Sequence, residues 1–282
     1  MMRTPTVDSA AQIRLVVNAD DFGMSPGISR GILRAHREGI VTSTSLLGNC
    51  GDFDDVRAML AEAPELGVGV HLALAGRGPI ADPALVPSLL TAGGRFHERG
   101  TDFVAAWTKR KIEAIDVERE FDAQIARVRD AGIKIDHLDT HHHLGFLPVV
   151  GRTVEAVARK HGIAAIRSAI ESPTLSWVTD PQRGLKAGVL TGLGWLTRRQ
   201  LGARRHSAQS WGYVESGRLD EVRVLEIIGR LGPGPHELIC HPGEDSTTSY
   251  DYTGELRALT SPKVRRALGQ RGVALCRWGD LF

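Results

Sequence analysis

Acidic and histidine residues follow several short apolar segments of this chain. Two adjacent aspartates, Asp20 and Asp21, follow an apolar segment near the start, and His71 follows another. A third segment leads into three consecutive histidines at 141–143. If these segments are strands of one parallel sheet, their carboxyl ends meet at one face and the polar side chains form a shared site. Carboxylates and imidazoles bind divalent cations and transfer protons near neutral pH, so metal-assisted hydrolysis is the chemistry to expect.

Two histidines and one carboxylate would make a three-ligand site with open positions, which suits a catalytic cation better than a structural one. On an extended chain, His141 and His143 would share a face and His142 would point away. A turn after the first strand can bring both aspartates to one pocket, where one could bind the cation and the other act as a base. Asp139 precedes His141 by two residues, so it could hold a ligand ring or cap the next helix.

Two further polar residues end predicted strands. His241 follows an apolar segment and precedes a Pro-Gly pair. It could act as an acid near neutral pH, and a hydrogen bond to a turn carbonyl is an equally supported alternative. Arg167 could bind a substrate oxygen or tune a carboxylate, although the sequence alone favours a peripheral ion pair.

A serine hydrolase is excluded despite a matching motif. Residues 23–27 read GMSPG, which fits the GxSxG nucleophile elbow between a strand and a helix. The oxyanion hole of that elbow needs the backbone N–H of the residue after the serine, and Pro26 has none. Ser25 is therefore predicted to cap a helix that begins at Pro26. No Walker A sequence is present, and no GxGxxG motif follows a strand.

Strand-like and helix-like segments alternate along the chain. Strands are predicted at 13–17, 41–47, 68–71, 133–138, 164–167, 237–240 and 273–277. Helices are predicted from Pro26, at 54–63, around 117–128, at 149–160, at 221–231 and from Pro262. This alternation predicts an α/β fold with about seven parallel strands in a closed or nearly closed barrel. We expect one domain over 1–282, with insertions near 79–116 and 172–216, the first of them over the site.

Composition limits the class of protein. The 282 residues have a formal net charge of +2, which gives no case for binding nucleic acid or a membrane through overall charge. No apolar segment approaches the ~18–20 residues that span a bilayer. Residues 1–12 are polar and resemble no signal peptide, which favours a cytoplasmic location. The three cysteines are far apart and are expected to be buried thiols.

Several motifs together resemble the YdjC-like carbohydrate deacetylase family, which includes chitooligosaccharide deacetylases. They occur in the family order and cover most of the chain outside the two insertions. The matching motifs are VNADDFG at 17–23, GIVTSTSL at 39–46, GVHL at 69–72, HLDTHHH at 137–143, LP at 147–148 and HPG at 241–243.

The resemblance implies a distorted or incomplete (β/α) TIM-like barrel of the polysaccharide-deacetylase type. It also implies one divalent metal ion (Mg or Zn), hydrolysis of the acetyl group of an N-acetylated amino sugar or oligosaccharide, and possibly a homodimer. By the same resemblance, Asp21, His71 and His141 are the metal ligands, Asp20 is the base and His241 is the acid. The identity of the sugar and of the metal stays open.

Two other functions are compatible with the residues. A metal-dependent phosphoesterase or another amidohydrolase would use the same ligands, with Asp139 and His143 as candidates for a second metal. A non-catalytic sugar-binding protein would retain the pocket. In the deacetylase reading, Asp139, His143 and Arg167 are candidates for binding substrate or supporting the ligands. Trp177, Trp195 and Trp211 could stack on a sugar ring, although local core packing is the more usual role of such residues.

Overall fold

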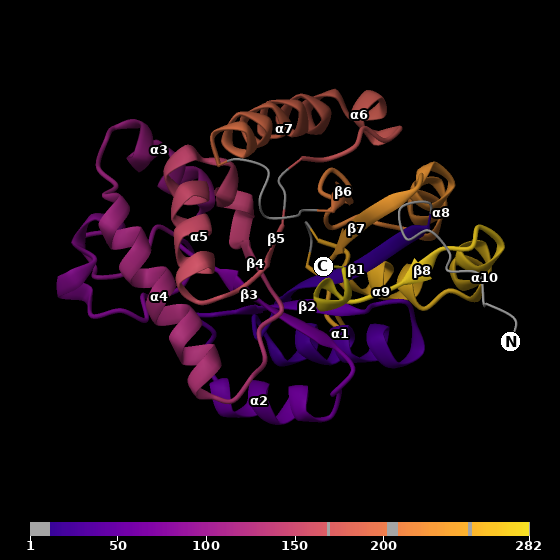
Figure 1. Cartoon of the computed structure of the whole chain (residues 1–282), viewed down its shortest axis with the longest axis horizontal. Coiled ribbons are helices and arrows are strands. Elements are labelled where there is room, and N and C mark those ends of the chain that lie inside the picture. Colours follow the sequence, from indigo (N-terminus) through magenta and orange to yellow (C-terminus); the bar gives the residue numbers. More distant parts are fainter. Residues whose placement is uncertain (1–11, 168–169, 202–207, 248–249, 282) are drawn as a thin grey trace, which may run out of the picture.

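The sheet of this protein is parallel throughout. The computed structural model describes residues 12–167, 170–201, 208–247 and 250–281. Within them the strands are β1 (Ile13–Phe22), β2 (Ser43–Leu47), β3 (Gly67–Leu72), β4 (His137–Thr140), β5 (Ala165–Ile166), β6 (Gln209–Trp211), β7 (Gly234–Cys240) and β8 (Ala274–Leu275). Their order across the sheet is β5-β4-β3-β2-β1-β7-β6, and β8 also pairs with β1 (Figure 1). The α/β fold predicted from the sequence is therefore confirmed.

The sheet forms an incomplete barrel. Strands β5 and β6 lie at opposite ends of the strand order. Between them, Glu171 and Ser210 form an isolated parallel bridge, and the backbone N–H of Ser172 donates to the carbonyl of Ser210 at 3.0 Å. The central strand β1 is buried on both faces, as Leu15, Val16 and Val17 are fully shielded from solvent. Such continuous apolar strands are typical of parallel sheets covered by helices.

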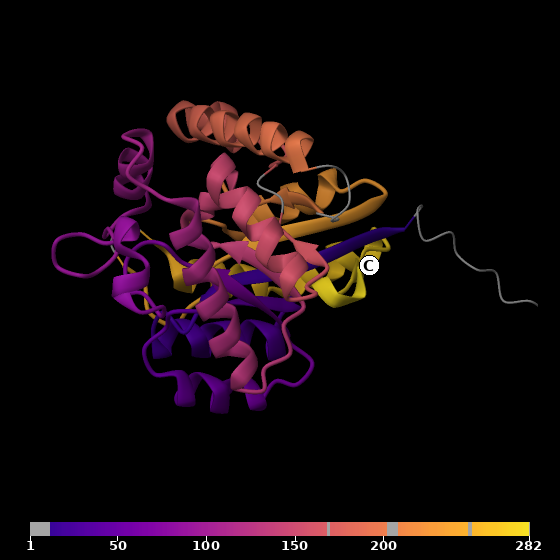
Figure 2. The same ribbon diagram turned by 60° about the vertical axis from the view of Figure 1, so that its left-hand side comes forward.

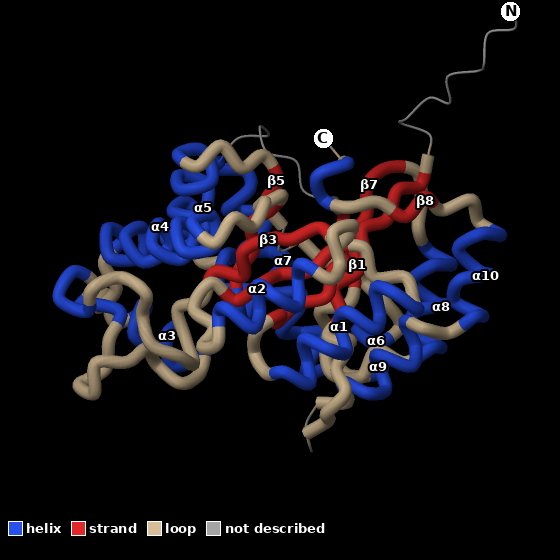
Figure 3. The backbone as a smooth tube through the Cα atoms, turned by 90° about the horizontal axis from the view of Figure 1, so that it is seen from below, coloured by secondary structure: helices blue, strands red, loops and turns tan. Residues whose placement is uncertain are grey.

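Helices surround the sheet (Figures 1 and 3). They are α1 (Pro26–Glu38), α2 (Phe53–Ala61), α3 (Gly100–Thr108), α4 (Ala114–Asp130), α5 (Pro148–Lys160), α6 (Ser176–Thr179), α7 (Pro181–Leu201), α8 (Glu221–Arg230), α9 (Tyr252–Leu259) and α10 (Pro262–Gln270). Short 3₁₀ helices are η1 (Pro83–Leu85), η2 (Pro87–Leu89), η3 (His141–Phe146) and η4 (Trp278–Asp280). Ser25 caps α1 as predicted, because its hydroxyl accepts the backbone N–H of Ile28 at 3.2 Å.

Two predicted strands had wrong boundaries, and a third strand was missed. The first strand was predicted to end at residue 17, whereas β1 continues to Phe22 through two aspartates. The pattern failed there because Arg167, far away in the sequence, pairs with the buried charge of Asp20 inside the fold. The strand predicted at 133–138 is β4 at 137–140. Strand β6 lies in the segment predicted to be an insertion, and its three residues are too few to show an alternating pattern.

Helices α6 and α7 form a roof over the molecule, and we call residues 176–201 the roof. In two views turned by 60° the long helix α7 lies outermost at the top (Figures 1 and 2). Its inner side contacts η3 and α5. No helix in the described ranges is long and apolar enough to cross a membrane. Most of the N-terminal segment from which a cytoplasmic location was predicted lies outside the described residues.

Candidate active site and metal centre

Both adjacent aspartates face one cavity because β1 bulges at its end. The pairing of β1 with β2 shifts register between Ala19 and Phe22, and Asp21 has a left-handed φ of 73°. In a regular strand, neighbouring side chains point to opposite faces, and a bulge redirects them. Asp20 and Asp21 therefore both line the cavity at the carboxyl end of the sheet, as the sequence predicted.

Three predicted ligands come together in a group that could hold a metal ion. The Oδ1 atom of Asp21 lies 3.1 Å from Nδ1 of His141 and 3.4 Å from Nε2 of His71. Ligands bound about 2.1 Å from one cation lie about 3.0–3.4 Å apart, so these spacings fit a shared coordination sphere. Asp21 Oδ1 is buried, and apart from its contacts with these two rings it accepts no hydrogen bond from the described residues, which is the condition of an atom that can share a cation with them.

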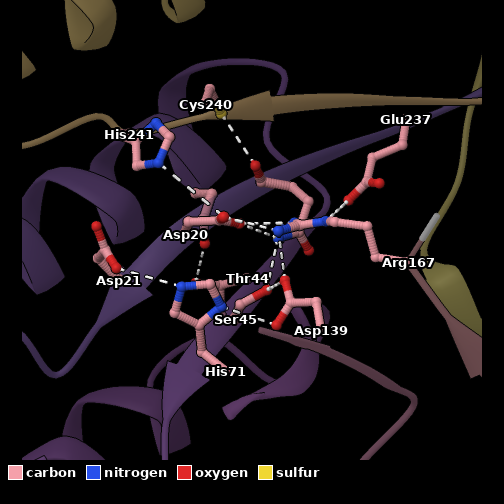
Figure 4. A network of polar contacts seen from close by, with 12 residues as sticks. Asp20, Asp21, Thr44, Ser45, His71, Asp139, Arg167, Glu237, Cys240 and His241 are labelled. Atoms are coloured by element: carbon pink, nitrogen blue, oxygen red, sulfur yellow. Dashed lines mark hydrogen bonds and ion pairs between the residues drawn. The ribbon is translucent and has the colours of Figure 1, made fainter. Parts of the chain in front are cut away.

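Asp139 orients the His71 ring. Its Oδ1 lies 2.8 Å from Nδ1 of His71, and its Oδ2 accepts a hydrogen bond from the Ser45 hydroxyl at 2.7 Å (Figure 4). This leaves Nε2 of His71 directed at Asp21, as expected for a ligand held by a carboxylate behind it. The predicted role of Asp139 in supporting a ligand ring is thus seen, with His71 rather than His141 as its partner. The alternative role as a helix cap is wrong, because Thr140 precedes η3 and no side chain caps it.

Arg167 stands at the centre of a buried ion network, so the prediction of a peripheral ion pair was wrong. Its guanidinium donates to both carboxylate oxygens of Asp20, at 2.6 and 2.7 Å, and to Glu237 at 2.8 Å (Figure 4). It also pairs with Asp139. The side chain of Arg167 is only 3% exposed. Bidentate pairing of this kind fixes the position of a carboxylate as well as its charge.

The acids of this network differ in the direction of their pKa shifts. Burial alone would raise the pKa of Asp20, but the charge and hydrogen bonds of Arg167, together with the His71 ring, lower that pKa below its ordinary value. For Glu237, burial prevails over the same guanidinium and raises the pKa to about 7. Asp20 is therefore an ionised acceptor near neutral pH, whereas Glu237 titrates there.

A second group of possible metal ligands is formed by Asp20, His71 and Asp139, and it is already paired with a guanidinium group. Arg167 pairs with both of its aspartates, and Asp139 also contacts the ring of His71. Both oxygens of Asp139 are thus occupied. Within the described residues, the group with an unsatisfied carboxylate oxygen is that of Asp21, His71 and His141.

His241 directly follows β7, on the other side of Asp20. Its Nε2 lies 4.0 Å from Oδ2 of Asp20, and its ring packs edge-on against Tyr250 with centroids 5.3 Å apart. Its backbone N–H donates to Glu255 at 2.6 Å. Its Nδ1 is buried and has no hydrogen-bond partner among the residues described, so the alternative of a bond to a turn carbonyl is not seen.

The three consecutive histidines do not follow an extended chain, and that part of the prediction was wrong. His142 and His143 have left-handed φ angles of 55° and 54°, because the chain turns into η3 directly after β4. His141 reaches Asp21, while His143 packs edge-on against Tyr213 with centroids 4.6 Å apart. Burial and the nearby charge of Arg167 lower the pKa of His143 to about 3, so it is neutral.

A cavity of about 700 Å³ lies above these residues. This volume is in the range of small-molecule sites. Arg99 and Thr101 line it, so the first predicted insertion does cover the site. Lys186 and Leu190 of α7 form another part of the wall. The polar and aromatic residues of the lining that the sequence did not single out are Arg99, Thr101, Phe146, Lys186, Tyr213, Ser216, Tyr250 and Tyr252.

The predicted tryptophans are absent from the described lining of the cavity. Trp211 is buried, and its indole N–H donates to His236 at 3.2 Å. Trp195 lies on α7 and is 57% exposed. The hypothesis of a tryptophan platform for sugar is therefore not supported, and the described aromatic lining consists of tyrosines and Phe146.

The fold and the site together define an α/β barrel protein with a candidate Asp/His metal centre at the carboxyl ends of its strands. The chain belongs to the YdjC-like protein family, whose model matches residues 14–270. The resemblance predicted from the motifs is thereby confirmed.

Relatives match along nearly the whole chain. A carbohydrate deacetylase of Geobacillus stearothermophilus is 30% identical over 280 residues, which cover 95% of this chain and 97% of the relative. A carbohydrate deacetylase of Listeria monocytogenes is 35% identical over 276 residues, covering 95% and 100%. A 1.70 Å crystal structure of an Enterococcus faecalis V583 protein is similar with a TM-score of 0.76 and 26% identity, covering 96% of this chain and 99% of that one.

Proposed function

We propose that this protein is a metal-dependent hydrolase that removes the acetyl group from an N-acetylated amino sugar and releases acetate. Family membership and relatives named carbohydrate deacetylase support the substrate class. The observation that carries the proposal is the contrast between two neighbouring carboxylates. Arg167 binds both oxygens of Asp20, whereas Asp21 directs its Oδ1 atom at the ring nitrogens of two histidines.

Asp21, His71 and His141 would hold one divalent cation, either Mg or Zn, since a carboxylate with two imidazoles accepts both. When bound, such an ion polarises the acetyl carbonyl and lowers the pKa of a water molecule from about 15.7 towards about 7. The carboxylate of Asp139 supports this arrangement, because it fixes the ring of His71 with Nε2 toward Asp21.

Asp20 is the proposed general base. Its carboxylate accepts the proton of the attacking water as the C–O bond to the acetyl carbon forms. Arg167 binds both oxygens of Asp20, so the group keeps its charge and its position in the low-dielectric interior. A correctly placed acid or base contributes typically about 10²–10⁴-fold in rate.

His241 is the proposed general acid. An amine is too basic to leave as an anion, so its nitrogen must be protonated as the C–N bond breaks. The Nε2 atom of His241 lies 4.0 Å from Asp20, and the two groups can therefore serve water attack and amine departure at one bound amide. The products are acetate and a free amino sugar.

The phosphoesterase alternative has weaker support. Two-metal hydrolysis needs a second set of free ligands that hold a second metal about 3.5–4 Å from the first. Asp139 already contacts His71, Ser45 and Arg167, and His143 belongs to neither group of possible ligands in the described part of the chain. These contacts favour a single cation and the acyl-transfer reaction.

The test compares the two aspartates in an amine-release screen over N-acetylated sugars, with the metal content measured for each protein. We expect the wild type to release amine and to lose activity with a chelator. Asp20→Asn should lose about 10²–10⁴-fold in turnover and keep its metal. Asp21→Asn should lose both.

The same screen also distinguishes the deacetylase from the two alternative functions. Release of phosphate from phosphoesters without release of amine would overturn the proposal in favour of the phosphoesterase. Sugar binding without turnover of any N-acetylated sugar would favour a non-catalytic protein. Retention of full activity by Asp20→Asn would refute the assignment of the base.

A further inference from the structure

A series of hydrogen bonds leads from the metal centre to the amino end of β4. It begins at Asp139, whose Oδ1 lies 2.8 Å from Nδ1 of His71. Ser45 donates its hydroxyl proton to the other oxygen of Asp139, Oδ2, at 2.7 Å (Figure 4). Nε2 of His137 lies 3.3 Å from the Ser45 oxygen, and Nδ1 of the same ring lies 2.6 Å from Oδ1 of Asp136. We call Ser45, His137 and Asp136 the support group.

The register of three strands brings Ser45 and His137 together. Ser45 of β2 is in register with Gly69 of β3, which is in register with His137 of β4. Because Gly69 has no side chain, the His137 ring lies across its backbone and reaches the Ser45 hydroxyl. A Cβ added at Gly69 would lie 2.3 Å from Nε2 of that ring. Trp278 stacks on the ring with centroids 5.4 Å apart, so His137 is fully buried in a defined orientation.

The hydroxyl of Ser45 makes every hydrogen bond that a hydroxyl can make. A serine hydroxyl donates one proton and accepts two. Its proton goes to Asp139, because a carboxylate that pairs with Arg167 is an acceptor. It accepts the side-chain N–H of Asn18 at 2.7 Å, so Nε2 of His137 supplies the second N–H. The direction of the series is therefore fixed, since His137 donates to Ser45 and Ser45 donates to Asp139.

The same residues have the order of a serine hydrolase triad, but they cannot act as one. In a triad the histidine accepts the proton of the serine. Here the proton of Ser45 is directed at Asp139, and Ser45 is fully buried. The support group is therefore part of the framework behind the metal centre and not a second catalytic site.

We propose that Ser45 and His137 are positioning residues for the metal ligand His71. Arg167 is shared among three carboxylates, so Ser45 is the donor that fixes the plane of the Asp139 carboxylate from the side of β2. The N–H of His137 holds and polarises that hydroxyl, since hydrogen bonds in series strengthen one another. A carboxylate fixed in this way keeps Nε2 of His71 directed at the cation. This inference rests on the metal centre of the proposed function.

The test is titration of the metal-free protein with Zn²⁺ against a competing chelator, which requires no turnover. We expect Ser45→Ala to weaken Zn²⁺ binding about 10–100-fold, the usual effect of removing an outer partner of a ligand. His137→Leu should weaken it about tenfold, because Ser45 keeps its bond to Asp139 but loses one donor. His137→Gln retains a side-chain N–H for Ser45 and should recover most of that loss.

The matched control is Ser43→Ala. Ser43 is also a fully buried serine of β2, and its hydroxyl accepts the backbone N–H of Trp278 at 3.3 Å. It has no contact with the support group through that hydroxyl, so this variant should bind Zn²⁺ as the wild type does. Urea denaturation of both serine variants measures the stability that each hydroxyl contributes, apart from any effect on the metal.

The outcomes separate this inference from the proposed function. Wild-type Zn²⁺ affinity in Ser45→Ala, or equal losses of affinity in Ser45→Ala and Ser43→Ala, would overturn the inference and leave the metal centre in place. Equal affinities of His137→Gln and His137→Leu would overturn the role of His137 as a donor. Absence of Zn²⁺ binding by the wild type would refute the metal centre and the inference together.

Circular dichroism checks that each variant is folded. If Ser45→Ala is unfolded, Ser45→Cys replaces it, because a thiol fills the same space but is a weak donor. The same loss of Zn²⁺ affinity is then expected, and unchanged affinity would again overturn the inference.

Discussion

Two buried carboxylates of this protein differ in the direction of their pKa shift. One belongs to the Arg167 network at the carboxyl ends of the strands, and the other lies beside β6. Asp20 faces Arg167, and its pKa is lowered despite burial. The backbone of Glu171 pairs with β6, and its side chain has Glu215 as a charged neighbour. Burial and repulsion by Glu215 raise the pKa of Glu171 to about 8. Both acids are buried, but the charge that Asp20 faces opposes the effect of burial on its pKa, whereas the charge that Glu171 faces adds to it.

Packing differs between the strand ends and the roof. Residues pack closely around the carboxyl ends of the strands. Gly100 at the start of α3, for example, lies directly against His142. The outer side of α7 meets no other part of the described chain near Gly192, where an added Cβ would have nothing within 4 Å. The strand ends are therefore expected to tolerate substitution poorly, and the roof to tolerate it well.

The largest effect is expected for Arg167→Met. This change removes the cation shared by Asp20, Asp139 and Glu237 and leaves their buried charges uncompensated. Breaking a buried ion pair in this way typically costs about 3–5 kcal/mol. Urea denaturation at pH 7 measures the loss.

The control for that prediction is Arg37→Met. Arg37 pairs with Glu62 at 2.8 Å, but both side chains are about half exposed or more. An exposed pair contributes about 0–1 kcal/mol. Equal losses in the two variants would mean that the buried network does not stabilise the fold as described.

The next effect concerns pH and Glu171. With its pKa raised from 4.5 to about 8, the folded state keeps a proton that the unfolded state releases, so stability falls as the pH rises through this window. Glu171→Gln needs no such proton. Between pH 5 and 8 the variant should lose less stability than the wild type, by up to about 4 kcal/mol at about 1.4 kcal/mol per pH unit.

Denaturation at several pH values tests this difference. Glu62→Gln, at an exposed surface carboxylate, should follow the wild type throughout. Parallel curves for the wild type and Glu171→Gln would contradict the contrast between the two buried acids.

A smaller effect is expected from adding a methyl group to each region. The Cβ of Gly100→Ala would lie 2.8 Å from Cβ of His142, which must move, at a cost of about 1–3 kcal/mol. Gly192→Ala in α7 meets no atom and should stabilise by about 0.5–1 kcal/mol through helix propensity. Thermal melting of both variants measures the effects, and the same sign in both would argue against the difference in packing.

The smallest effect on stability is expected for Leu185→Ser on the roof. The side chain is 72% exposed, so the change should alter the free energy of unfolding by no more than about 0.5 kcal/mol. Chemical denaturation checks this value. A loss of several kcal/mol would show that the outward side of α7 packs within the chain.

The parts of the site that sequence reasoning found share one property. Asp20, Asp21, His71 and His241 stand at or just after strands, and parallel strands bring their carboxyl ends together. Their assembly could be predicted without knowing any contact. The bulge that turns both aspartates to one side could not, because it depends on the register between β1 and β2.

The parts that were missed or misplaced depend on distant pairing. Arg167 was a candidate for tuning a carboxylate, but its contact with Asp20 spans 147 residues of chain, and no local pattern encodes it. Glu237 did leave a signal, since it is a charged residue inside the apolar strand β7. Tyr213 and Lys186 come from the segment predicted to be an insertion, whose composition reveals neither β6 nor the direction of α7.

The incomplete barrel also has a consequence for aggregation. An open sheet exposes backbone N–H and C=O groups along its two outer strands, which can recruit further strands and start aggregation. Here those strands are among the shortest in the sheet, with two residues in β5 and three in β6. Such brief edges offer few hydrogen bonds to an intruding chain. Mutations that lengthen either edge strand are expected to make this fold more prone to form fibrils.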